Sequence, residues 1–494
     1  MSKDQRKERP TARLLPFAGA ALTAFALTAC SGDDDNGGGD QPPPGDDPVG
    51  AIFALTNRHD NSEQLRAMGQ DALPPTAEGN EVVAYSRFAD GSLELVGVFP
   101  TGGIGENIRN SGANPLASQD PLIVSEDGQF LFAVNAGSDT VTTMVIGEGN
   151  TLTAMDPVST AGTSGMQNPV SLTTRNGVLY VLNSGTFFDT DETTELTFVP
   201  DGGEATRLRR DCGILGFNIA PNGALSPLDG SETTANDFPG FMGSGANDGN
   251  GLLGSNGGSI DFSEDGSALY ITERRTNNIV TVLLDGNMVP NGMGSNFDSS
   301  VAQPFGTEVV VTTAGTEVLL VSQGNNGAEG LSALSSFTIG SDGVLSAVSQ
   351  ADGDPMDPFI TGFTFGCWVE SFIGSNGNTY AYTANTPDGT LTGYVVNSGT
   401  GALTRLETPV AGMDFPNIPF TGDAGGGGVL DTEIAGGFLY QVVNVGNPDD
   451  TNNNSRISVF QVNTSPAGSL TRMQNLDVEN ALFVPRQFVG IAGF

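Results

Sequence analysis

The chain of 494 residues carries 57 acidic side chains against 19 basic ones, so its net charge at pH 7 is −38. Such a surface repels nucleic acid and anionic lipid headgroups, which excludes both as partners. No lysine follows Lys7, and this density of negative charge suits a saline medium, where ions screen the self-repulsion; a generally acidic lineage is the alternative.

The first 30 residues have the layout of a secretory signal. Basic residues lie within residues 3–13, an apolar stretch runs from Leu14 to Leu27, and Thr28, Ala29 and Cys30 follow. The apolar stretch is shorter than the roughly 20 residues of a membrane-spanning helix. Leu-Thr-Ala-Cys resembles the lipobox of bacterial lipoproteins, which implies that Cys30 becomes a lipidated N-terminus. An ordinary signal peptide with a chance cysteine is the alternative.

Residues 31–50 are expected to form a disordered acidic tether. Gly, Pro and Asp dominate this stretch and apolar side chains are almost absent, so it cannot bury a core. The tether would hold the following domain away from a membrane that only the lipid touches. Ser31 after the cysteine resembles lipoproteins of the outer membrane, so the expected location is the cell envelope.

Residues 51–494 are predicted to form an all-β domain, a seven-bladed β-propeller of four-stranded antiparallel blades. Residues 121–156 contain four short β-rich stretches separated by Gly, Asp and Asn turns, which is the pattern of one blade. Self-similarity of this kind indicates a repeat architecture. Complete units of the same pattern occupy residues 121–156, 169–230, 258–285, 305–348, 365–405 and 429–474.

The seventh unit is split between the two ends of the domain. Residues 51–57 match a second strand and residues 82–99 match strands three and four, whereas residues 485–494 match an orphan first strand. The C-terminal strand is therefore predicted to complete the N-terminal blade and close the ring, which protects the sheet edges. Six or eight blades are alternatives, because the insertion at 185–211 could hide a hairpin. A closed ring hides its own edges, so a monomer is expected.

The second strand of most units ends in asparagine, a residue that suits turns, so the structural interpretation is a turn residue. Two units depart from this pattern, and a broken repeat can mark a functional site. Second strands end, and first strands begin, on the same face of a propeller, where ligands often bind. The residues expected at this channel mouth are Asn57, Arg58, His59, Asn135, Asn183, Glu273, Arg274, Gln323, Cys367, Trp368 and Asn444. The predicted ligand-binding residues among them are Arg58, Asn135, Asn183, Gln323, Trp368 and Asn444.

Three residues of this set are candidate catalysts. A carboxylate beside a guanidinium, as in Glu273 and Arg274, could position an anionic or hydroxylated ligand; a solvated surface ion pair is the alternative. His59 is the single histidine of the chain and could act as a general base, or it is an ordinary exposed histidine.

The two remaining cysteines are both expected on the mouth face. A disulfide between Cys212 and Cys367 would pin the 185–211 insertion across the mouth as a partial lid, and two free thiols are the alternative. The chain contains no Cys/His cluster, so no metal site and no cofactor are expected.

Several stretches resemble the lactonase family of seven-bladed propellers, which includes bacterial 6-phosphogluconolactonase and fungal carboxymuconate-lactonizing enzymes. They include LIVSEDGQFLFAVNAGSDTV, PVSLTTRNGVLYVLN, SIDFSEDGSALYITERRTNNI and the terminal FVGIAGF, and the resemblance spans nearly all of 51–494. In that family a Gly-Pro-Arg-His motif opens one first strand, and a glutamate ends the next strand. Here Glu273 matches the glutamate, but Gly258 and Ser259 stand in place of the arginine and histidine.

The leading functional hypothesis is therefore a lipid-anchored envelope propeller that binds a small polar ligand, a glycan or a protein at the channel mouth. The first alternative is a lactone hydrolase in which His59 or Arg274 acts with Glu273, because lactone chemistry needs a proton donor or acceptor near the reacting oxygen. A structural envelope protein is the second alternative.

Overall fold

The computed structural model describes residues 47–57, 79–105, 116–185, 212–234, 237, 257–274, 276–299, 301–340, 343–351, 358–406, 428–445, 454–464, 467–477 and 488–494. The predicted signal, Cys30, most of the tether, Arg58, His59 and almost all of the 185–211 insertion lie outside these residues.

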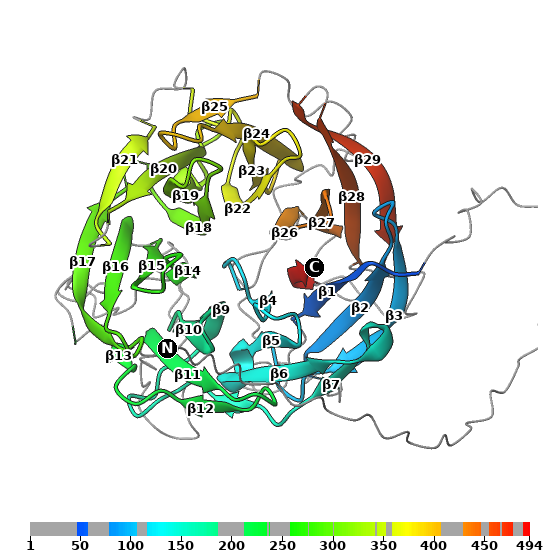
Figure 1. Ribbon diagram of the computed structural model, residues 1–494, viewed down its shortest axis with the longest axis vertical. Coiled ribbons are helices and arrows are strands. Elements are labelled where there is room, and N and C mark those ends of the chain that lie inside the picture. Colours follow the sequence, from blue (N-terminus) through cyan, green and yellow to red (C-terminus); the bar gives the residue numbers. More distant parts are fainter. Residues whose placement is uncertain are drawn as a thin grey trace, which may run out of the picture. The chain divides into compact units, whose positions relative to one another are not determined.

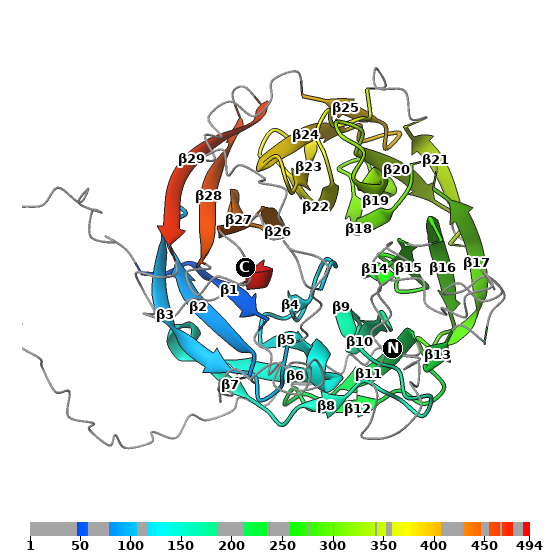
Figure 2. The same ribbon diagram turned by 180° about the vertical axis from the view of Figure 1, so that it is seen from behind.

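The described strands form seven antiparallel sheets arranged as blades around a centre (Figures 1 and 2). Blade one contains β30 (Phe488–Gly493), β1 (Gly50–Thr56), β2 (Glu81–Arg87) and β3 (Leu93–Pro100). Blade two contains β4 (Leu122–Val124), β5 (Phe130–Asn135), β6 (Thr140–Ile146), β7 (Leu152–Ala154) and the short β8 (Val158–Ser159). Blade three contains β9 (Pro169–Arg175), β10 (Val178–Asn183), β11 (Gly213–Ile219), β12 (Leu225–Pro227) and the short β13 (Thr233–Thr234).

The remaining four blades each have four strands in chain order. Blade four contains β14 (Gly257–Phe262), β15 (Ala268–Glu273), β16 (Asn278–Leu284) and β17 (Pro290–Asp298). Blade five contains β18 (Pro304–Val311), β19 (Glu317–Gln323), β20 (Ala333–Ile339) and β21 (Leu345–Ser349). Blade six contains β22 (Gly366–Ile373), β23 (Thr379–Asn385), β24 (Thr390–Val396) and β25 (Leu403–Arg405). Blade seven contains β26 (Val429–Ala435), β27 (Phe438–Val445), β28 (Asn454–Thr464) and β29 (Ala467–Asp477).

Ring closure occurs through the C-terminal strand, which confirms the predicted split of the first blade. The strand β30 pairs antiparallel with β1, and Phe53 lies opposite Ala492 in this register. The Nε of Arg87 donates a hydrogen bond to the Phe494 carbonyl at 3.0 Å, which holds the chain end against β2. The seven-bladed all-β fold expected from the repeats is therefore confirmed, with a short fifth strand added to blades two and three.

The core is a series of contacts between neighbouring blades. The second strands are rich in β-branched and aromatic residues, and β5 and β15 are buried at every position because a blade packs on each side of them. The outer strands are more exposed, as in β25, where two of three residues are exposed. One apolar cluster joins blades three and four and another joins blades six, seven and one, so the apolar contacts continue around the ring.

The turns between first and second strands repeat a Ser-x-Asp-Gly pattern in two blades. In blade two, Ser125 Oγ donates to Asp127 Oδ1 at 2.7 Å, and Gly128 has a positive φ of 69° that a side chain would strain. In blade four, Ser263 and Asp265 repeat this hydrogen bond at 2.9 Å. These turns lie at the far ends of the first strands, on the face opposite the predicted mouth.

Candidate functional site

The asparagines that end second strands hold the blades together. In blade two, the Nδ2 of Asn135 donates to Thr142 Oγ1 at 2.9 Å, and in blade six Asn385 repeats this bond to Thr392 at 3.0 Å. Asn183 differs, because its Nδ2 donates to the Thr160 carbonyl at 3.2 Å instead of to a threonine hydroxyl of strand three. All three asparagines are buried. The sequence predicted a turn residue here, and the structure adds that these side chains also tie strand two to the next strand or to a neighbouring segment.

The other predicted ligand-binding residues at this face are placed differently. The Gln323 side chain is fully buried, and its Oε1 accepts a hydrogen bond from Ser335 Oγ at 2.7 Å. Asn444 lies opposite Ser455 in blade seven, but its side chain is outside the described part of the molecule. Asn57 follows β1 and is 6% exposed.

Glu273 and Arg274 lie inside the protein rather than on its surface. Glu273 has no exposed surface, and its Oε2 accepts a hydrogen bond from Thr276 Oγ1 at 2.5 Å. Arg274 is 6% exposed, and its guanidinium carbon lies 5.4 Å from the centre of the Phe305 ring. Burial lowers the pKa of Arg274 to about 10. The interpretation as a solvated surface ion pair is therefore wrong.

The positions where the family resemblance expects an arginine and a histidine are closely packed. Gly258 and Ser259 lie in an irregularity at the start of β14, where the register shifts between Gly257 and Ile260. A Cβ on Gly258 would lie 2.8 Å from the Phe305 carbonyl oxygen. The Ser259 hydroxyl is 2.7 Å from the Thr307 hydroxyl. The space for long side chains here is occupied by neighbouring strands.

A segment before blade two crosses the channel at the predicted mouth. In this channel plug, residues 116–120, Gln119 donates from Nε2 to the Thr307 carbonyl at 2.7 Å and accepts from the Val369 N–H at 3.0 Å. Its own N–H donates to the Gly258 carbonyl at 3.0 Å. These partners belong to the first strands of blades five, six and four, so the plug spans the centre of the ring.

Trp368 is part of this closure. It is 2% exposed, and its Nε1 donates to the Ser118 carbonyl of the channel plug at 2.9 Å. Gly306 permits the close approach of the plug, because a Cβ there would lie 2.1 Å from Gln119 Oε1. Trp368 therefore faces protein atoms in this structure.

The predicted disulfide is not formed in this structure. Cys212 and Cys367 are both buried, and neither is disulfide-bonded. Each packs in a separate apolar cluster, Cys212 near Leu182 between blades three and four, and Cys367 near Phe305. Burial raises the pKa of the Cys367 thiol to about 12, which the nearby Arg274 charge partly offsets. The alternative of two thiols without a disulfide applies here.

Below the channel plug, four consecutive blades place an acidic residue at matching positions of their first strands. In blades four to seven these residues lie opposite the second strand, in the pairs Asp261 with Tyr270, Glu308 with Leu320, Glu370 with Tyr382 and Glu433 with Tyr440. The same position holds Thr173 in blade three, Ile123 in blade two and Ala492 in blade one.

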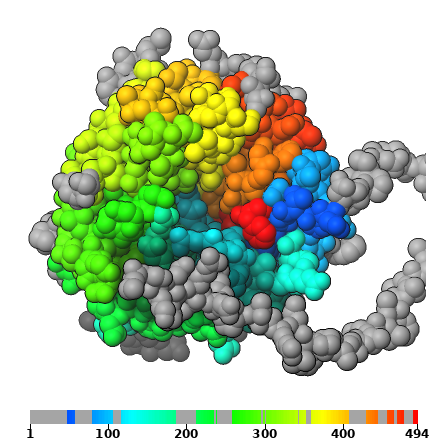
Figure 3. Space-filling model, in the orientation of Figure 1, coloured from blue at the N-terminus to red at the C-terminus, as the bar shows by residue number. Residues whose placement is uncertain are grey.

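These side chains line a central cavity of about 270 Å³. Much of the remaining wall is formed by Asp120 of the channel plug, Ile123, Val124 and Leu172. Among the described residues, no basic side chain lines the cavity. The space-filling view is hollowed near the middle of the ring, between green strands of blades four and five and orange and red strands of blades seven and one (Figure 3). The lining reaches the last residues of the first strands, so the cavity extends toward the face opposite the plug.

The carboxyl groups of the cavity have raised pKa values, because they are buried and because their negative charges repel one another. Burial and then the charge of Asp120 raise the pKa of Glu308 to about 8. Burial also raises the pKa of Asp120 to about 7. Glu370 and Glu433 have pKa values well above the ordinary range because of burial and then of neighbouring carboxylates. Closely placed carboxylates in a low-dielectric site cannot all ionise at neutral pH without a counter-charge.

Only some of the carboxylate oxygens of this acidic wall accept hydrogen bonds from the protein. Ser371 Oγ donates to Glu308 Oε1 at 3.0 Å, and the Ile491 N–H donates to Asp431 Oδ2 at 3.2 Å. Asp261 Oδ2 is closed to solvent and has no donor in hydrogen-bond geometry among the described residues. Burial raises the pKa of this carboxyl group well above its ordinary range, although the Thr307 hydroxyl lowers it in part. A buried carboxylate oxygen without a donor costs folding free energy. A ligand that donates a hydrogen bond to this oxygen would remove that cost.

Sequence reasoning missed the acidic wall, although a signal was present. Each of these first strands is otherwise apolar or small, as in GGSIDF around Asp261 and GCWVESFI around Glu370. An acidic residue recurring at one position of these strands, with a second one, Asp431, in β26, departs from the residue types usually found inside a fold. Comparing the first strands position by position would have revealed the pattern.

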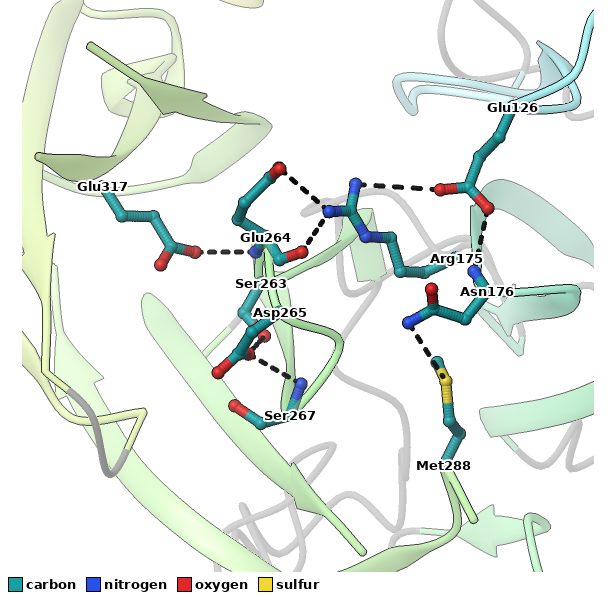
Figure 4. A network of polar contacts seen from close by, with 9 residues as sticks. All are labelled: Glu126, Arg175, Asn176, Ser263, Glu264, Asp265, Ser267, Met288 and Glu317. Atoms are coloured by element: carbon teal, nitrogen blue, oxygen red, sulfur yellow. Dashed lines mark hydrogen bonds and ion pairs between the residues drawn. The ribbon is translucent and has the colours of Figure 1, made fainter. Parts of the chain in front are cut away.

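A rim of acidic turns surrounds the far end of the first strands in blades two to five. Arg175, next to the cavity residue Thr174, contacts Glu126 of blade two at 3.7 Å and Glu264 of blade four at 2.9 Å (Figure 4). The Glu264 N–H donates to Glu317 Oε1 of blade five at 2.7 Å. These contacts link four neighbouring blades at this face.

Comparisons with known proteins show the fold of the chain. No protein-family model matches it, and no curated protein matches its sequence. A putative 6-phosphogluconolactonase from Bacteroides uniformis is similar in structure, with a TM-score of 0.51, 15% identity and coverage of 90% of this chain and 99% of that one. A putative 6-phosphogluconolactonase from Bacteroides fragilis has a TM-score of 0.50, 16% identity and coverage of 90% and 98%. The structural neighbours are thus 6-phosphogluconolactonase-like propellers.

The described residues contain neither a candidate group of metal ligands nor a candidate membrane-spanning helix. Within the described residues, no three or more His, Cys, Asp or Glu side chains are grouped so that they could hold a metal ion. No helix in the same part of the chain is long and apolar enough to cross a membrane.

Proposed function

We propose that the protein is a ligand-binding propeller whose site is the central cavity, where it holds a small polar ligand. The observation that carries this proposal is the wall of carboxyl groups from consecutive blades, which includes an oxygen without a donor at Asp261. Acidic side chains inside a fold without counter-charges or donors are found most often at functional sites, where a ligand supplies the missing charge or hydrogen bond. A cavity of about 270 Å³ suits a small molecule better than a glycan chain or a protein.

The face opposite the predicted mouth is the proposed route to this cavity. The plug residues Ser118 and Gln119 bond to first strands of several blades, and Trp368 packs beneath them. Ser118, Gln119 and Trp368 at that end are therefore taken up by contacts within the protein. A ligand therefore reaches the acidic wall from the side of the turns that carry Glu126 and Glu264.

The test compares two variants that each remove one negative charge. Glu370→Gln changes the acidic wall without changing its volume, whereas Glu148→Gln changes an exposed turn of blade two. In a thermal-shift screen of small polar compounds, we expect a hit on the native protein that Glu370→Gln loses and Glu148→Gln keeps. Hits that both variants retain would contradict the central cavity as the site.

Lactone hydrolysis is the second candidate function, and one observation favours it. Glu308 and Asp120 line the cavity with pKa values of about 8 and about 7, which suit proton transfer near neutral pH. A carboxylate would take a proton from a water molecule as that water attacks the lactone carbonyl carbon. The ring C–O bond would break, and the protonated carboxyl group would return the proton to the leaving oxygen.

Turnover of sugar lactones by the purified protein tests this second candidate. If Glu308 is the base, Glu308→Gln abolishes turnover and Glu273→Gln retains it. The reverse result would place the chemistry beside Arg274, at the site that the sequence predicts. Absence of turnover leaves ligand binding as the function.

We also propose that the protein is anchored in the cell envelope through a lipid on Cys30. The support is the order of basic, apolar and small residues before this cysteine and the acidic tether after it. Cys30→Ser should move the protein from the membrane fraction to the soluble fraction of a bacterial host. An unchanged distribution would contradict the anchor.

A further inference from the structure

We propose that the ligand of the central cavity is a small organic ammonium compound. This inference rests on the proposed function, because it names the chemical class that the same cavity accepts. Three properties of the described wall support it: the sign of its charge, the spacing of its acids and the presence of an apolar side.

The sign of the charge follows from the lining. Asp261, Glu308, Glu370 and Glu433 face one cavity from four consecutive blades, and Asp120 of the channel plug adds a fifth carboxyl group. Among the described residues no arginine or lysine lines the cavity. A cation is the ligand that relieves the mutual repulsion of these groups, because a positive charge attracts each carboxylate around it.

The shortage of hydrogen-bond donors in the wall also favours an ammonium ligand. Asp261 Oδ2 is buried without a donor in the described structure, and one Glu308 oxygen accepts from the Ser371 hydroxyl. An ammonium group supplies both positive charge and N–H donors, and charge-assisted hydrogen bonds of this kind are about twice as strong as neutral ones. A neutral polar ligand would supply donors but leave the repulsion.

The spacing of the acids argues against a bare metal ion. Within the described residues, no group of three or more potential ligands is close enough to hold one. Calcium requires six to eight oxygen ligands at about 2.3–2.6 Å, which a wall spread over several blades and a wide cavity does not provide. The cavity is instead large enough for an ion that carries carbon atoms.

The cavity also has an apolar side. Ile123 and Val124 of β4, with Leu172 of β9, line it from blades two and three. Blade two lies across the ring from blades five and six, which carry Glu308 and Glu370 (Figure 1). An organic ammonium ion would place its charged nitrogen against the acids and its carbon atoms against Ile123. A hydrated metal ion has no apolar surface to match this side.

Access from the acidic rim fits the same class of ligand. Glu126, Glu264 and Glu317 lie at the far face, and the positive charge of Arg175 is already paired with the first two. A surface with one sign of charge raises the local concentration of oppositely charged ligands and speeds their association. The rim would therefore attract cations toward the opening.

Isothermal titration calorimetry with four probes tests the inference: propylammonium, choline, neutral propanol and Mg²⁺. We expect saturable binding of at least one of the two ammonium probes to the native protein. Glu370→Gln should weaken it about 10- to 100-fold, because a charged hydrogen bond is lost, and Glu148→Gln should leave it unchanged. Ile123→Thr should weaken the ammonium probe several-fold and leave any Mg²⁺ binding unchanged.

The other outcomes separate this inference from the proposed function. Binding of propanol or of a neutral screening hit that Glu370→Gln abolishes would keep the cavity as a site but overturn the ammonium class. Binding of Mg²⁺ alone would overturn it in favour of a metal ion. If neither ammonium probe binds and no compound shows dependence on Glu370, both the inference and the proposed function fail.

Discussion

The two polar regions along the channel differ in how their hydrogen bonds are completed. At the plugged end, Gln119, Trp368 and Ser259 each have partners within the protein, so the side chains act as packing. In the cavity below, the carboxyl groups share few donors, and Asp261 Oδ2 has none among the described residues. These three side chains at the plugged end are held by the protein itself, whereas the cavity presents ionisable groups that a ligand can reach.

The largest expected effect tests the plugged end. Trp368→Ala should lower the free energy of unfolding by about 3–5 kcal/mol, because it leaves a cavity beneath the channel plug and an unpaired Ser118 carbonyl. Denaturant unfolding measures this change. Trp368→Phe, which keeps an aromatic ring, should cost less. If Trp368→Ala lowers the free energy of unfolding by less than about 0.5 kcal/mol, as for a surface residue, the plugged end is not held by packing as described.

The pH dependence of stability tests the acidic wall. The folded pKa values of Asp120, about 7, and Glu308, about 8, lie above the ordinary values of 3.8 and 4.5, so the native state binds more protons between these limits. On this account, stability should therefore be highest below about pH 4 and fall as pH rises toward 8, by about 1.4 kcal/mol for each unit of raised pKa. The groups that face them and titrate with them are Asp261, Glu370, Asp431 and Glu433.

Thermal unfolding across this pH range, with and without the ammonium probe, provides the measurement. A bound cation should flatten the dependence, because it stabilises the ionised carboxylates. Stability that rises with pH from 5 to 8 would contradict the buried, mutually repelling wall.

Removal of one acid from the wall should stabilise the unliganded protein. Glu433→Gln keeps the shape and the acceptor near Gly493 but removes a charge that burial and neighbouring carboxylates disfavour. We expect a gain of about 1 kcal/mol at pH 8, together with weaker ligand binding, which is the usual trade-off at functional sites. Glu148→Gln is the matched control, and an equal gain in both variants would assign the effect to net charge alone.

The smallest expected effect concerns the rim. Arg175→Gln breaks partly exposed ion pairs with Glu126 and Glu264, so the cost should be about 0.2–1 kcal/mol and should shrink in high salt. Faster cation binding is expected at low salt, because the rim becomes more negative. Stopped-flow association rates at two salt concentrations measure this, and a slower rate in the variant would argue against access from this face.

Sequence reasoning identified the elements more completely than the site. The matches at 51–57 and 485–494 correctly predicted the pairing of β1 with β30, because both stretches carry the strand pattern locally. Glu273 and Arg274 were also recognised as unusual, but their burial was not, since no local pattern shows what packs over a turn. The Cys212–Cys367 pairing failed for the same reason.

The sequence by itself indicated seven blades, with six or eight as alternatives, and it predicted the strand order and the closure of the ring, because periodicity and turn residues act over a few neighbouring positions. Only the tertiary structure decided which polar side chains meet. Asp261, Glu308, Glu370 and Glu433 are far apart along the chain and become neighbours only when four first strands converge on one axis. Likewise, residues 116–120 act as a plug only because the assembled ring presents Thr307, Val369 and Gly258 to Gln119 at once.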